Sequence, residues 1–447
     1  MELVMDRVTY GVLSVVALVT LLWIQVEPSL LTSDNFFQWR SGLIQYSGIL
    51  SLILMSTAMV LALRLPIIET WTQGLDKGYR IHKWLGIAAV LLGAFHWLAY
   101  HLPKWLISLE VMSKPVRFNG SGPNANLTGW AQWLKSLKPL ALESGEWGFY
   151  LLLALLVLSL WSVVKYKPFR LTHRLMAIVY LLLAFHSFAL LKRAYWGEPI
   201  YWLTTCFLVL GSLAALYSLA GLVGRRARYS ASVKALRYCA LSQTLDLTLE
   251  AEAKWPSHQA GQFAYLCFAG EEPHPFTIAS APNSSQLRFL IKELGDFTTG
   301  LHQRLSQGDV LQIEGPYGKF SFTAERPQIW IGAGVGIAPF MAGLEWFASQ
   351  QSHPQTHLFF CCQQAEPRLC EELKQKAQQA GVSLTVMDSS KDLLLSAQSI
   401  AQQCGDLRQF EFYFCGPAPF SNALKKALKP YRVKVDKAFH AEKFVMR

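Results

Sequence analysis

The chain has 447 residues, more than a single ordinary domain holds, and a formal net charge of +11. Hydrophobic residues make up 52% of it and charged residues only 16%. Its one basic cluster, Arg225, Arg226 and Arg228, directly follows an apolar run, which indicates a membrane flank and excludes a nucleic-acid patch. Residues 1–224 carry 17 Lys and Arg with 10 Asp and Glu, against 24 and 20 in the remainder, so only the first half has the charge content of a membrane protein.

Six apolar segments in the first half are each close to the length that spans a bilayer. They cover residues 9–26, 41–63, 82–102, 147–164, 171–191 and 200–223. The short connections at 64–81 and 165–170 are rich in Lys and Arg, as is the segment after 223, so the positive-inside rule predicts that these sides are cytoplasmic. Six spans then place both termini on that side, and residues 103–146 form a long external loop.

Two of these segments carry two histidines each. His82 and His96 are 14 residues apart, and His173 and His186 are 13 apart, which separates the members of each pair by roughly 20 Å along a helix. Fourteen residues are close to four helical turns, whereas thirteen fall about one residue short and require some twist. Two such helices side by side would give His–His pairs at two depths, which suits two stacked b-type hemes.

Two other interpretations of the histidines are open. Each could be a hydrogen-bonded or boundary residue, although ionisable groups inside membranes tend to be functional. A di-metal site would need closely spaced ligands at i, i+3 or i, i+4, and the four histidines have no such spacing.

Beyond about residue 230, short alternating runs predict the strands of an antiparallel barrel: LDLTLEAEA, FAYLCFAG and QLRFLIKEL. From about 327 the pattern becomes strand, glycine-rich turn and helix, in QIWIGAGVGIAPFMAGLEWF. Further strands are predicted at HLFFCC, SLTVMD and FEFYFCG, with helical stretches such as EELKQKAQQAG between them. This alternation predicts an α/β domain with a parallel sheet.

HPFTIAS, residues 274–280, is a weak motif alone. Together with GQF at 261–263, IKELGDFT at 291–298 and EGPYG at 314–318, it resembles the flavin-binding barrel of the ferredoxin–NADP reductase superfamily. An ordinary barrel strand with a turn proline is the alternative.

The resemblance assigns roles within this barrel. Pro275 and Phe276 are expected to line the flavin, and the Thr277 hydroxyl is expected to reach its N5 edge. His274 and Thr298 are expected beside the pyrophosphate. IKELGDFT adds two further cofactor-binding residues, Lys292 and Asp296.

GAGVGIAP, residues 332–339, lies between a predicted strand and a predicted helix. Its glycines allow the backbone to approach a pyrophosphate, whose charge a helix N-terminus favours. Pro339 occupies the last position, so this is not the G-x-G-x-x-G fingerprint. It matches the nicotinamide loop of the same superfamily, and FCGPAPF at 414–420 matches the second nucleotide contact. The residues so implied are Gly332, Gly334, Gly336, Pro339, Cys415, Gly416 and Pro417.

Three residues form the expected catalytic set. The resemblance places Cys415 beside the nicotinamide C4 and Phe444, in AEKFVMR, against the flavin ring, with Thr277 on the flavin N5. A buried inert thiol is the alternative for Cys415, and ordinary packing is the alternative for Phe444.

Taken in order, the motifs resemble the ferric reductase and NADPH oxidase superfamily over nearly all of the chain, and its compact bacterial members most. The resemblance implies a six-helix heme-binding transmembrane bundle at 1–228, an antiparallel FAD-binding barrel at 229–325 and an NAD(P)-binding α/β domain at 326–447. The implied cofactors are two b-type hemes, FAD, and NADPH or NADH. His82 would pair with His173 around the inner heme, and His96 with His186 around the outer one.

The implied function is a transmembrane oxidoreductase that passes electrons from cytosolic NAD(P)H through FAD and the hemes to ferric chelates or O2 outside. It would lie in a bacterial inner membrane, with the flavin and nucleotide domains in the cytoplasm, and would require neither a protein partner nor nucleic acid. Two alternatives stay open. One is an electron-supply module for a dedicated periplasmic protein or a quinone; the other is a heme- or metal-handling membrane protein that is not an enzyme.

Two features bear on the acceptor and the donor. Arg40, in QWRSG, resembles an arginine that in many members pairs with heme propionates or holds an anionic acceptor, and His101 could assist a proton or bind metal. Interfacial solvation is the alternative for both. In FFCCQQAEPR, Gln363 stands near the place where NADP-preferring members keep an arginine, and Arg368 is the nearest cation, so NADH is as open as NADPH.

Overall fold

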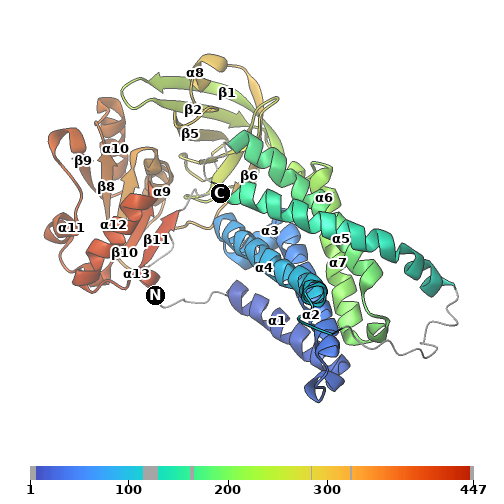
Figure 1. The fold of residues 1–447 in the computed structure, drawn as a ribbon. Helices are drawn as coiled ribbons and strands as arrows, with labels where there is room; N and C mark the ends of the chain where they lie inside the picture. The colour runs from blue at the N-terminus through green and yellow to red at the C-terminus, as the bar shows by residue number, and fades with distance from the viewer. Residues whose placement is uncertain (1–6, 114–128, 162–165, 283, 323–324, 443–447) are drawn as a thin grey trace. The chain divides into compact units, whose positions relative to one another are not determined.

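The computed structural model describes residues 7–113, 129–161, 166–282, 284–322 and 325–442. The chain divides into two compact units, residues 1–72 with 77–223 and residues 73–76 with 224–447. The long helices belong to the first unit, and both β-sheets belong to the second (Figure 1).

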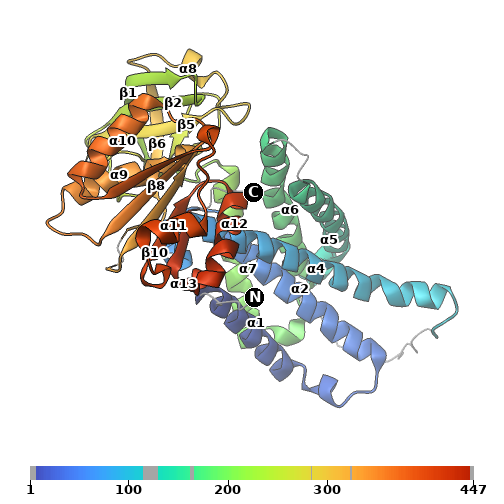
Figure 2. The same cartoon turned by 90° about the vertical axis from the view of Figure 1, so that its left-hand side faces the viewer.

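The first unit is a helical bundle whose long helices run side by side (Figure 2). Its helices are α1 (Arg7–Val26), α2 (Phe36–Leu61), α3 (Pro66–Thr72), α4 (Leu75–Ser108), α5 (Trp130–Leu160), α6 (Tyr166–Leu190) and α7 (Pro199–Leu219), with short 3-10 turns at Pro28–Leu31, Arg193–Tyr195 and, past α7, Arg225–Ala227. Within the described residues, five helices are long and apolar enough to cross a membrane: α2, α4, α5, α6 and α7. The described apolar part of α1, Tyr10–Val26, is shorter, so the predicted sixth span stays a prediction.

The structure places helical residues inside three of the predicted connections. The connection at 64–81 contains α3 and the first turns of α4, and α6 begins at Tyr166, inside the predicted connection at 165–170. The external loop at 103–146 is helical over 103–108 and 130–146, because α4 continues through Pro103 and α5 through Pro139. Both prolines lie inside their helices, and neighbouring groups can satisfy the carbonyl that a proline leaves without a donor.

Small and hydroxylated residues set the close helix packing of this bundle. Helix α5 packs along α6, and α2 packs along α7. The Tyr180 hydroxyl in α6 lies 2.8 Å from Ser56 Oγ in α2, and a Cβ added at Gly211 in α7 would come within 2.1 Å of that hydroxyl. Small residues that admit a neighbouring side chain are the usual contact of membrane helices.

The second unit begins with a six-stranded antiparallel sheet in the order β4-β3-β6-β1-β2-β5. Its strands are β1 (Arg228–Cys239), β2 (Thr244–Ala251), β3 (Phe263–Cys267), β4 (His274–Thr277), β5 (Gln286–Lys292) and β6 (Val310–Tyr317), with the short helix α8 (Leu301–Arg304) before β6. The two edge strands also meet, because Ile278, directly after β4, bridges Phe289 in β5. The predicted strands LDLTLEAEA, FAYLCFAG and QLRFLIKEL are confirmed as β2, β3 and β5.

A five-stranded parallel sheet follows, in the order β11-β10-β7-β8-β9. Its strands are β7 (Gln328–Ala333), β8 (Thr356–Cys362), β9 (Ser383–Asp388), β10 (Glu411–Cys415) and β11 (Phe439–Glu442). Its helices are α9 (Ala338–Ala348), α10 (Pro367–Gln379), α11 (Ala397–Cys404), α12 (Ala418–Leu428) and α13 (Val435–Ala438), with 3-10 turns at Gly334–Ile337, Ser389–Lys391, Leu407–Gln409 and Lys429–Tyr431. The predicted α/β pattern is confirmed.

Alternate residues of the parallel strands face two separate cores. Trp330 in β7 packs with α9 and α10 on one face of the sheet, while Ile329 and Ile331 pack with α11 and α12 on the other. Helices therefore cover both faces. The chain runs from β7 to β8 on one side and returns to β10 on the other, so the carboxyl ends of β7 and β10 flank the switch point where such sheets bind ligands.

Candidate functional site

The four membrane histidines form two facing pairs. His82 in α4 and His173 in α6 have ring centres 5.8 Å apart, and His96 and His186, farther along the same helices, have ring centres 6.1 Å apart. The predicted pairing is therefore present in the geometry. The 13-residue spacing on α6 does not prevent it, because both rings of that helix reach their partners on α4.

Each of the four rings uses its Nδ1 to contact the surrounding helices. The Nδ1 atoms of His82, His96 and His186 lie 2.7–2.9 Å from backbone carbonyls of α2 or α5, at Ala58, Ile44 and Ala141 respectively. The Nδ1 of His173 lies 3.2 Å from the Ser159 hydroxyl in α5. A ring that donates Nδ1–H to a carbonyl keeps the lone pair on Nε2, which is the tautomer of a metal-ligating histidine.

The separation of the rings in each pair fits a metal held between them. A metal held at about 2 Å by one nitrogen of each ring needs ring centres about 6 Å apart, as both pairs have. Gly86, one turn beyond His82, has no atom within 4 Å of where its Cβ would lie, whereas a Cβ at Gly145 would come within 2.0 Å of His186 Nδ1. Among the described residues, no group of three or more His, Cys, Asp and Glu side chains could hold a metal ion.

Arg40 contacts the backbone of the histidine helix. Its Nε donates to the Ala99 carbonyl at 2.8 Å, and its Nη2 donates to the Tyr100 carbonyl at 2.9 Å. Pro103 has no N–H to offer the carbonyl four residues before it, which is that of Ala99, so Arg40 supplies the missing donor. The sequence suggested heme propionates, an anionic acceptor or interfacial solvation for Arg40, and did not reveal this contact with the α4 backbone.

His101 lies among aromatic rings one turn beyond the second pair. Its ring centre is 4.7 Å from that of Trp97 and 5.9 Å from that of Trp105. Its Nε2 is 3.9 Å from a Glu146 carboxylate oxygen, the edge of ion-pair range. These contacts give His101 an interfacial packing position.

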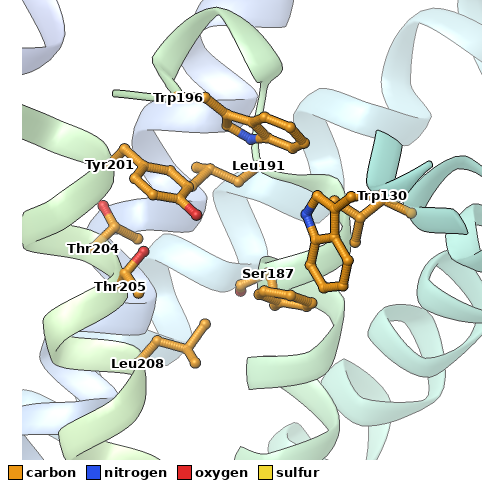
Figure 3. A pocket seen from close by; sticks show the side chains of 10 residues that line it. Trp130, Ser187, Leu191, Trp196, Tyr201, Thr204, Thr205 and Leu208 are labelled. Atoms are coloured by element: carbon orange, nitrogen blue, oxygen red, sulfur yellow. The ribbon is translucent and has the colours of Figure 1, made fainter. Parts of the chain in front are cut away.

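A small cavity is lined by residues of α5, α6 and α7 and of the segment between α6 and α7 (Figure 3). It has a volume of about 20 Å³, room for roughly one water-sized molecule. Its lining combines aromatic and leucine side chains with hydroxyls, and includes no charged residue: Trp130, Leu134, Ser187, Phe188, Leu191, Trp196, Tyr201, Thr204, Thr205 and Leu208.

In the second unit, β4 carries the predicted flavin residues. Pro275, Phe276 and Thr277 pair with Tyr265, Ala264 and Phe263 of β3, and Thr277 is buried. This hydrogen-bonded edge fixes the direction of each side chain along the strand.

The other predicted flavin residues gather at the turn after β5. The His274 ring stacks on Phe297 at 3.7 Å, which brings it to that turn. Thr298 Oγ1 accepts hydrogen bonds from the backbone N–H groups of Leu294 at 2.9 Å and Gly295 at 3.2 Å, so this hydroxyl shapes the turn. Lys292 is the last residue of β5, and Asp296 is exposed within the turn.

The two predicted nucleotide loops touch each other through their backbones. A Cβ added at Gly336 would lie 2.2 Å from the Cys415 carbonyl oxygen, and one added at Gly416 would lie 2.7 Å from the Ala333 Cβ. A Cβ added at Gly332 would lie 3.0 Å from the Ile337 Cα in the same loop, and Gly334 has a φ of +57°. The loop then enters α9, with Pro339 in its first turn, while Pro417 caps α12. Only glycine admits this close backbone approach at the carboxyl ends of β7 and β10.

Thr277, Cys415 and Glu442 come together where the two sheets meet. Cys415 ends β10 and Glu442 ends β11, and these two residues are register partners. The Cys415 thiol donates to Glu442 Oε2 at 3.6 Å, and the Thr277 hydroxyl hydrogen-bonds the same carboxyl group. The structure therefore joins two of the three predicted catalytic residues through Glu442; the third, Phe444, lies outside the described residues.

Burial controls protonation in this cluster. It raises the pKa of Glu442 to about 8, although the hydrogen bonds from Cys415 and Thr277 act in the opposite direction. Burial and the adjacent carboxylate also raise the pKa of the Cys415 thiol well above its ordinary value. At neutral pH the thiol and most of the carboxyl are thus protonated, and Cys415 is no thiolate nucleophile.

Sequence reasoning missed Glu442. Its position two residues before Phe444, in the very stretch assigned to the flavin, was the available signal. A lone glutamate near a terminus looks solvated, and only the pairing of β10 with β11 places it against Cys415.

Three protein-family descriptions match the chain, one after another. "Ferric reductase like transmembrane component" matches residues 47–184, "FAD-binding domain" matches 228–327 and "Oxidoreductase NAD-binding domain" matches 330–426. The first match contains all four histidines, the second contains β1–β6, and the third contains both glycine-rich loops.

Individual relatives cover different shares of the chain. A flavohemoprotein of Vibrio cholerae is 30% identical over 42% of this chain and 51% of its own length. The heavy chain of a superoxide-generating NADPH oxidase of Dictyostelium discoideum is 25% identical over 67% of this chain and 47% of its own. The chain thus spans about half the length of these two relatives. Among solved structures, the FAD/NAD-binding domain of a Vibrio cholerae nitric oxide dioxygenase is 24% identical over 48% of this chain and 98% of its own, with a TM-score of 0.42.

Proposed function

Because the chain belongs to the superfamily that joins a ferric-reductase-like transmembrane component to FAD- and NAD-binding domains, we propose that it carries electrons from NAD(P)H across a membrane to an acceptor on the far side. The two facing histidine pairs are the observation that carries this proposal. One pair alone would suit a local site, whereas two pairs spaced along α4 and α6 suit transport through the bilayer.

The proposed architecture has three domains: a six-span bundle at 1–228, a closed FAD-binding barrel at 229–325 and an NAD(P)-binding domain at 326–447. The 20-residue length of α1 supports a sixth span, since about 20 helical residues cross a hydrocarbon core. The bridge from Ile278 to Phe289 supports barrel closure. In the proposed arrangement the helical bundle lies in a bacterial inner membrane. Basic residues after α7 support a cytoplasmic position for the second unit.

Two b-type hemes would be held by His82 with His173 and by His96 with His186. When bound, these groups accept and pass single electrons, and FAD converts the two-electron donor into single-electron steps. The protein's part is to present four Nε2 atoms in fixed tautomers, which the contacts of Nδ1 with Ala58, Ile44, Ala141 and Ser159 secure.

The flavin and nucleotide residues divide their roles by sheet. Phe276 and Pro275 would line the flavin, while Gly336 and Gly416 would admit the dinucleotide backbone. Thr277 would stand at the flavin edge, with Cys415 and the protonated Glu442 facing it from the nucleotide side. A neutral carboxyl there donates a hydrogen bond and places no negative charge beside the hydride path.

The uncharged cavity lined by α5, α6 and α7 favours dioxygen as the acceptor. It is water-sized and its lining has no charge, so it suits a neutral diatomic molecule and offers nothing to an anionic ferric chelate. The Ser187, Tyr201 and Thr205 hydroxyls could stabilise charge that develops on the bound molecule.

Cofactor content and product test this function. The purified protein should contain two hemes per FAD and should form superoxide from NAD(P)H faster than it reduces ferric citrate. Replacing Thr205 by Leu should narrow the cavity and lower the superoxide yield while ferric reduction stays unchanged. One heme or none would contradict the two-heme path, and equal loss of both products would contradict the cavity as an oxygen site.

A further inference from the structure

A cluster of opposite charges joins the two sheets of the second unit. Arg288 in β5 contacts Asp246 in β2 at two points, with Nε 2.8 Å from Oδ1 and Nη2 2.8 Å from Oδ2. The same guanidinium reaches Glu372 in α10, with Nη2 3.0 Å from Oε2 and a second contact from Nη1 to Oε1. Arg288 therefore ties a helix of the parallel-sheet half to the antiparallel sheet.

These ion pairs are held in place more firmly than surface pairs. The side chains of Arg288 and Asp246 are each 17% exposed, and that of Glu372 is 25% exposed. Burial alone would raise the pKa of Glu372, but the hydrogen bonds and charge of Arg288 outweigh it and lower that pKa to about 2. Planar two-point pairs of this kind fix geometry as well as distance.

A second arm of the cluster runs through Lys376. Its Nζ lies 3.0 Å from Glu372 and also contacts Glu345 in α9. The other oxygen of Glu345 accepts a hydrogen bond from the Ala281 backbone N–H at 2.6 Å. Ala281 belongs to the antiparallel half, so α9 and α10 both hold that half through carboxylates.

Both arms end on the segment that carries Thr277. The Ala279 N–H donates to the Arg288 carbonyl at 2.7 Å, and the Arg288 N–H donates to Ser280 Oγ at 3.2 Å. Ala281, held by Glu345, is four residues beyond Thr277. The cluster thus fixes residues 279–281, which follow the proposed flavin-contacting residue Thr277 in the chain.

We propose that Arg288, Glu372 and Glu345 are positioning residues that fix the nucleotide-binding half against segment 277–281, so that Cys415 and Glu442 face Thr277. This inference rests on the proposed function, because it concerns the geometry of hydride transfer from nicotinamide to flavin. That transfer is sensitive to small displacements, since a shift of about 1 Å between reacting groups can cost about a hundredfold in rate. The cluster acts through the backbone and touches neither cofactor.

Two isosteric variants test the proposal: Glu372→Gln and Glu345→Gln. Each keeps the side-chain shape and an acceptor oxygen while removing a charge. The matched control is Glu250→Gln, which breaks an exposed pair with Lys234 at 2.9 Å within the antiparallel sheet. In anaerobic stopped-flow reduction of the complete protein, we expect the limiting rate of flavin reduction by NAD(P)H to fall about tenfold or more in both test variants. The nucleotide concentration at half-maximal rate should stay within about twofold, and the control should match wild type.

Three further readouts separate the possible outcomes. Dithionite, which needs no nucleotide alignment, should reduce the flavin of every variant at the wild-type rate. Limiting rates equal to wild type in both test variants would overturn the proposal, as would losses that follow FAD content or the rate with dithionite. If wild type itself failed to reduce its flavin with NAD(P)H, the proposed function would fail, and the positioning role with it.

Discussion

At the scale of single residues, the four membrane histidines share one feature, which is a contact made by the ring nitrogen Nδ1. All four Nδ1 atoms contact a carbonyl or hydroxyl of a neighbouring helix, and the rings face each other in pairs. Histidines that only satisfied the core would have no reason to form two facing pairs between α4 and α6. Their spacing was readable from the sequence because helical rise converts residue number into depth.

His96→Ala tests this use of the rings. We expect the variant to lose one heme of two and nearly all reduction of the far-side acceptor, while flavin reduction by NAD(P)H continues, because His96 belongs to one pair only. Heme and flavin content by absorption spectroscopy measures the effect. His101→Ala, five residues along the same helix, is the control and should keep both hemes. If His96→Ala retained two hemes, the assignment of His96 as a heme ligand would be wrong.

Glu442 gives a pH prediction. Its pKa of about 8 means that the carboxyl is neutral below pH 8 and becomes an anion above it. An anion beside the hydride path disfavours transfer of negative charge to the flavin, so the rate of flavin reduction should fall as pH rises through about 8. Glu442→Gln stays neutral and should lack this inflection. Stopped-flow rates between about pH 6 and pH 9.5 provide the measurement, and an unchanged inflection in the variant would assign it to another group.

Among the elements, the helix ends were the least predictable part of the fold. The predicted span ends at residue 102, yet α4 continues through Pro103 to Ser108, where Arg40, 59 residues away from Ala99, supplies a donor to the Ala99 carbonyl. No local pattern contains that information. The strands were predicted more closely, since alternation along β2, β3 and β5 and the apolar run of β7 follow directly from which faces are buried.

A double-mutant cycle tests the contact between Arg40 and α4. Arg40→Ala should lower the free energy of unfolding by about 1–3 kcal/mol, because the Ala99 carbonyl loses its donor in an apolar setting. In a Pro103→Ala background, the restored backbone N–H takes that role and the same change should cost about 1 kcal/mol less. Denaturation in detergent measures both. Equal costs in the two backgrounds would mean that Arg40 acts elsewhere.

The close approach of the two nucleotide loops makes Gly336 a sensitive position. Gly336→Ala should push the loop away from Cys415, because the new Cβ would lie 2.2 Å from a backbone carbonyl that cannot rotate aside. We expect weaker NAD(P)H binding by about tenfold or more with normal FAD content. Gly295→Ala, where a Cβ has open space, is the control. NAD(P)H affinity can be measured by following flavin fluorescence as the nucleotide is added. Wild-type affinity in Gly336→Ala would mean that nucleotide binding does not depend on the close approach of the two loops.

For the whole molecule, sequence reasoning recovered the order of its parts better than the links between them. The helical first half, the antiparallel sheet and the parallel sheet were each visible in local periodicity and composition. The joining residues were not, because Arg288, Glu372 and Glu442 acquire their partners only when distant strands and helices meet. A charged residue in a strand looks the same in sequence whether it is solvated or held between two sheets.

The central claim is that one chain carries electrons from a nicotinamide through flavin and heme to an acceptor. The most direct measurement is the visible spectrum of the purified protein in detergent, recorded without oxygen after NADPH or NADH is added. We expect reduced b-heme bands to appear and then to bleach when air or ferric citrate is admitted. Complete absence of heme bands would contradict it and would leave a membrane-tethered flavin reductase.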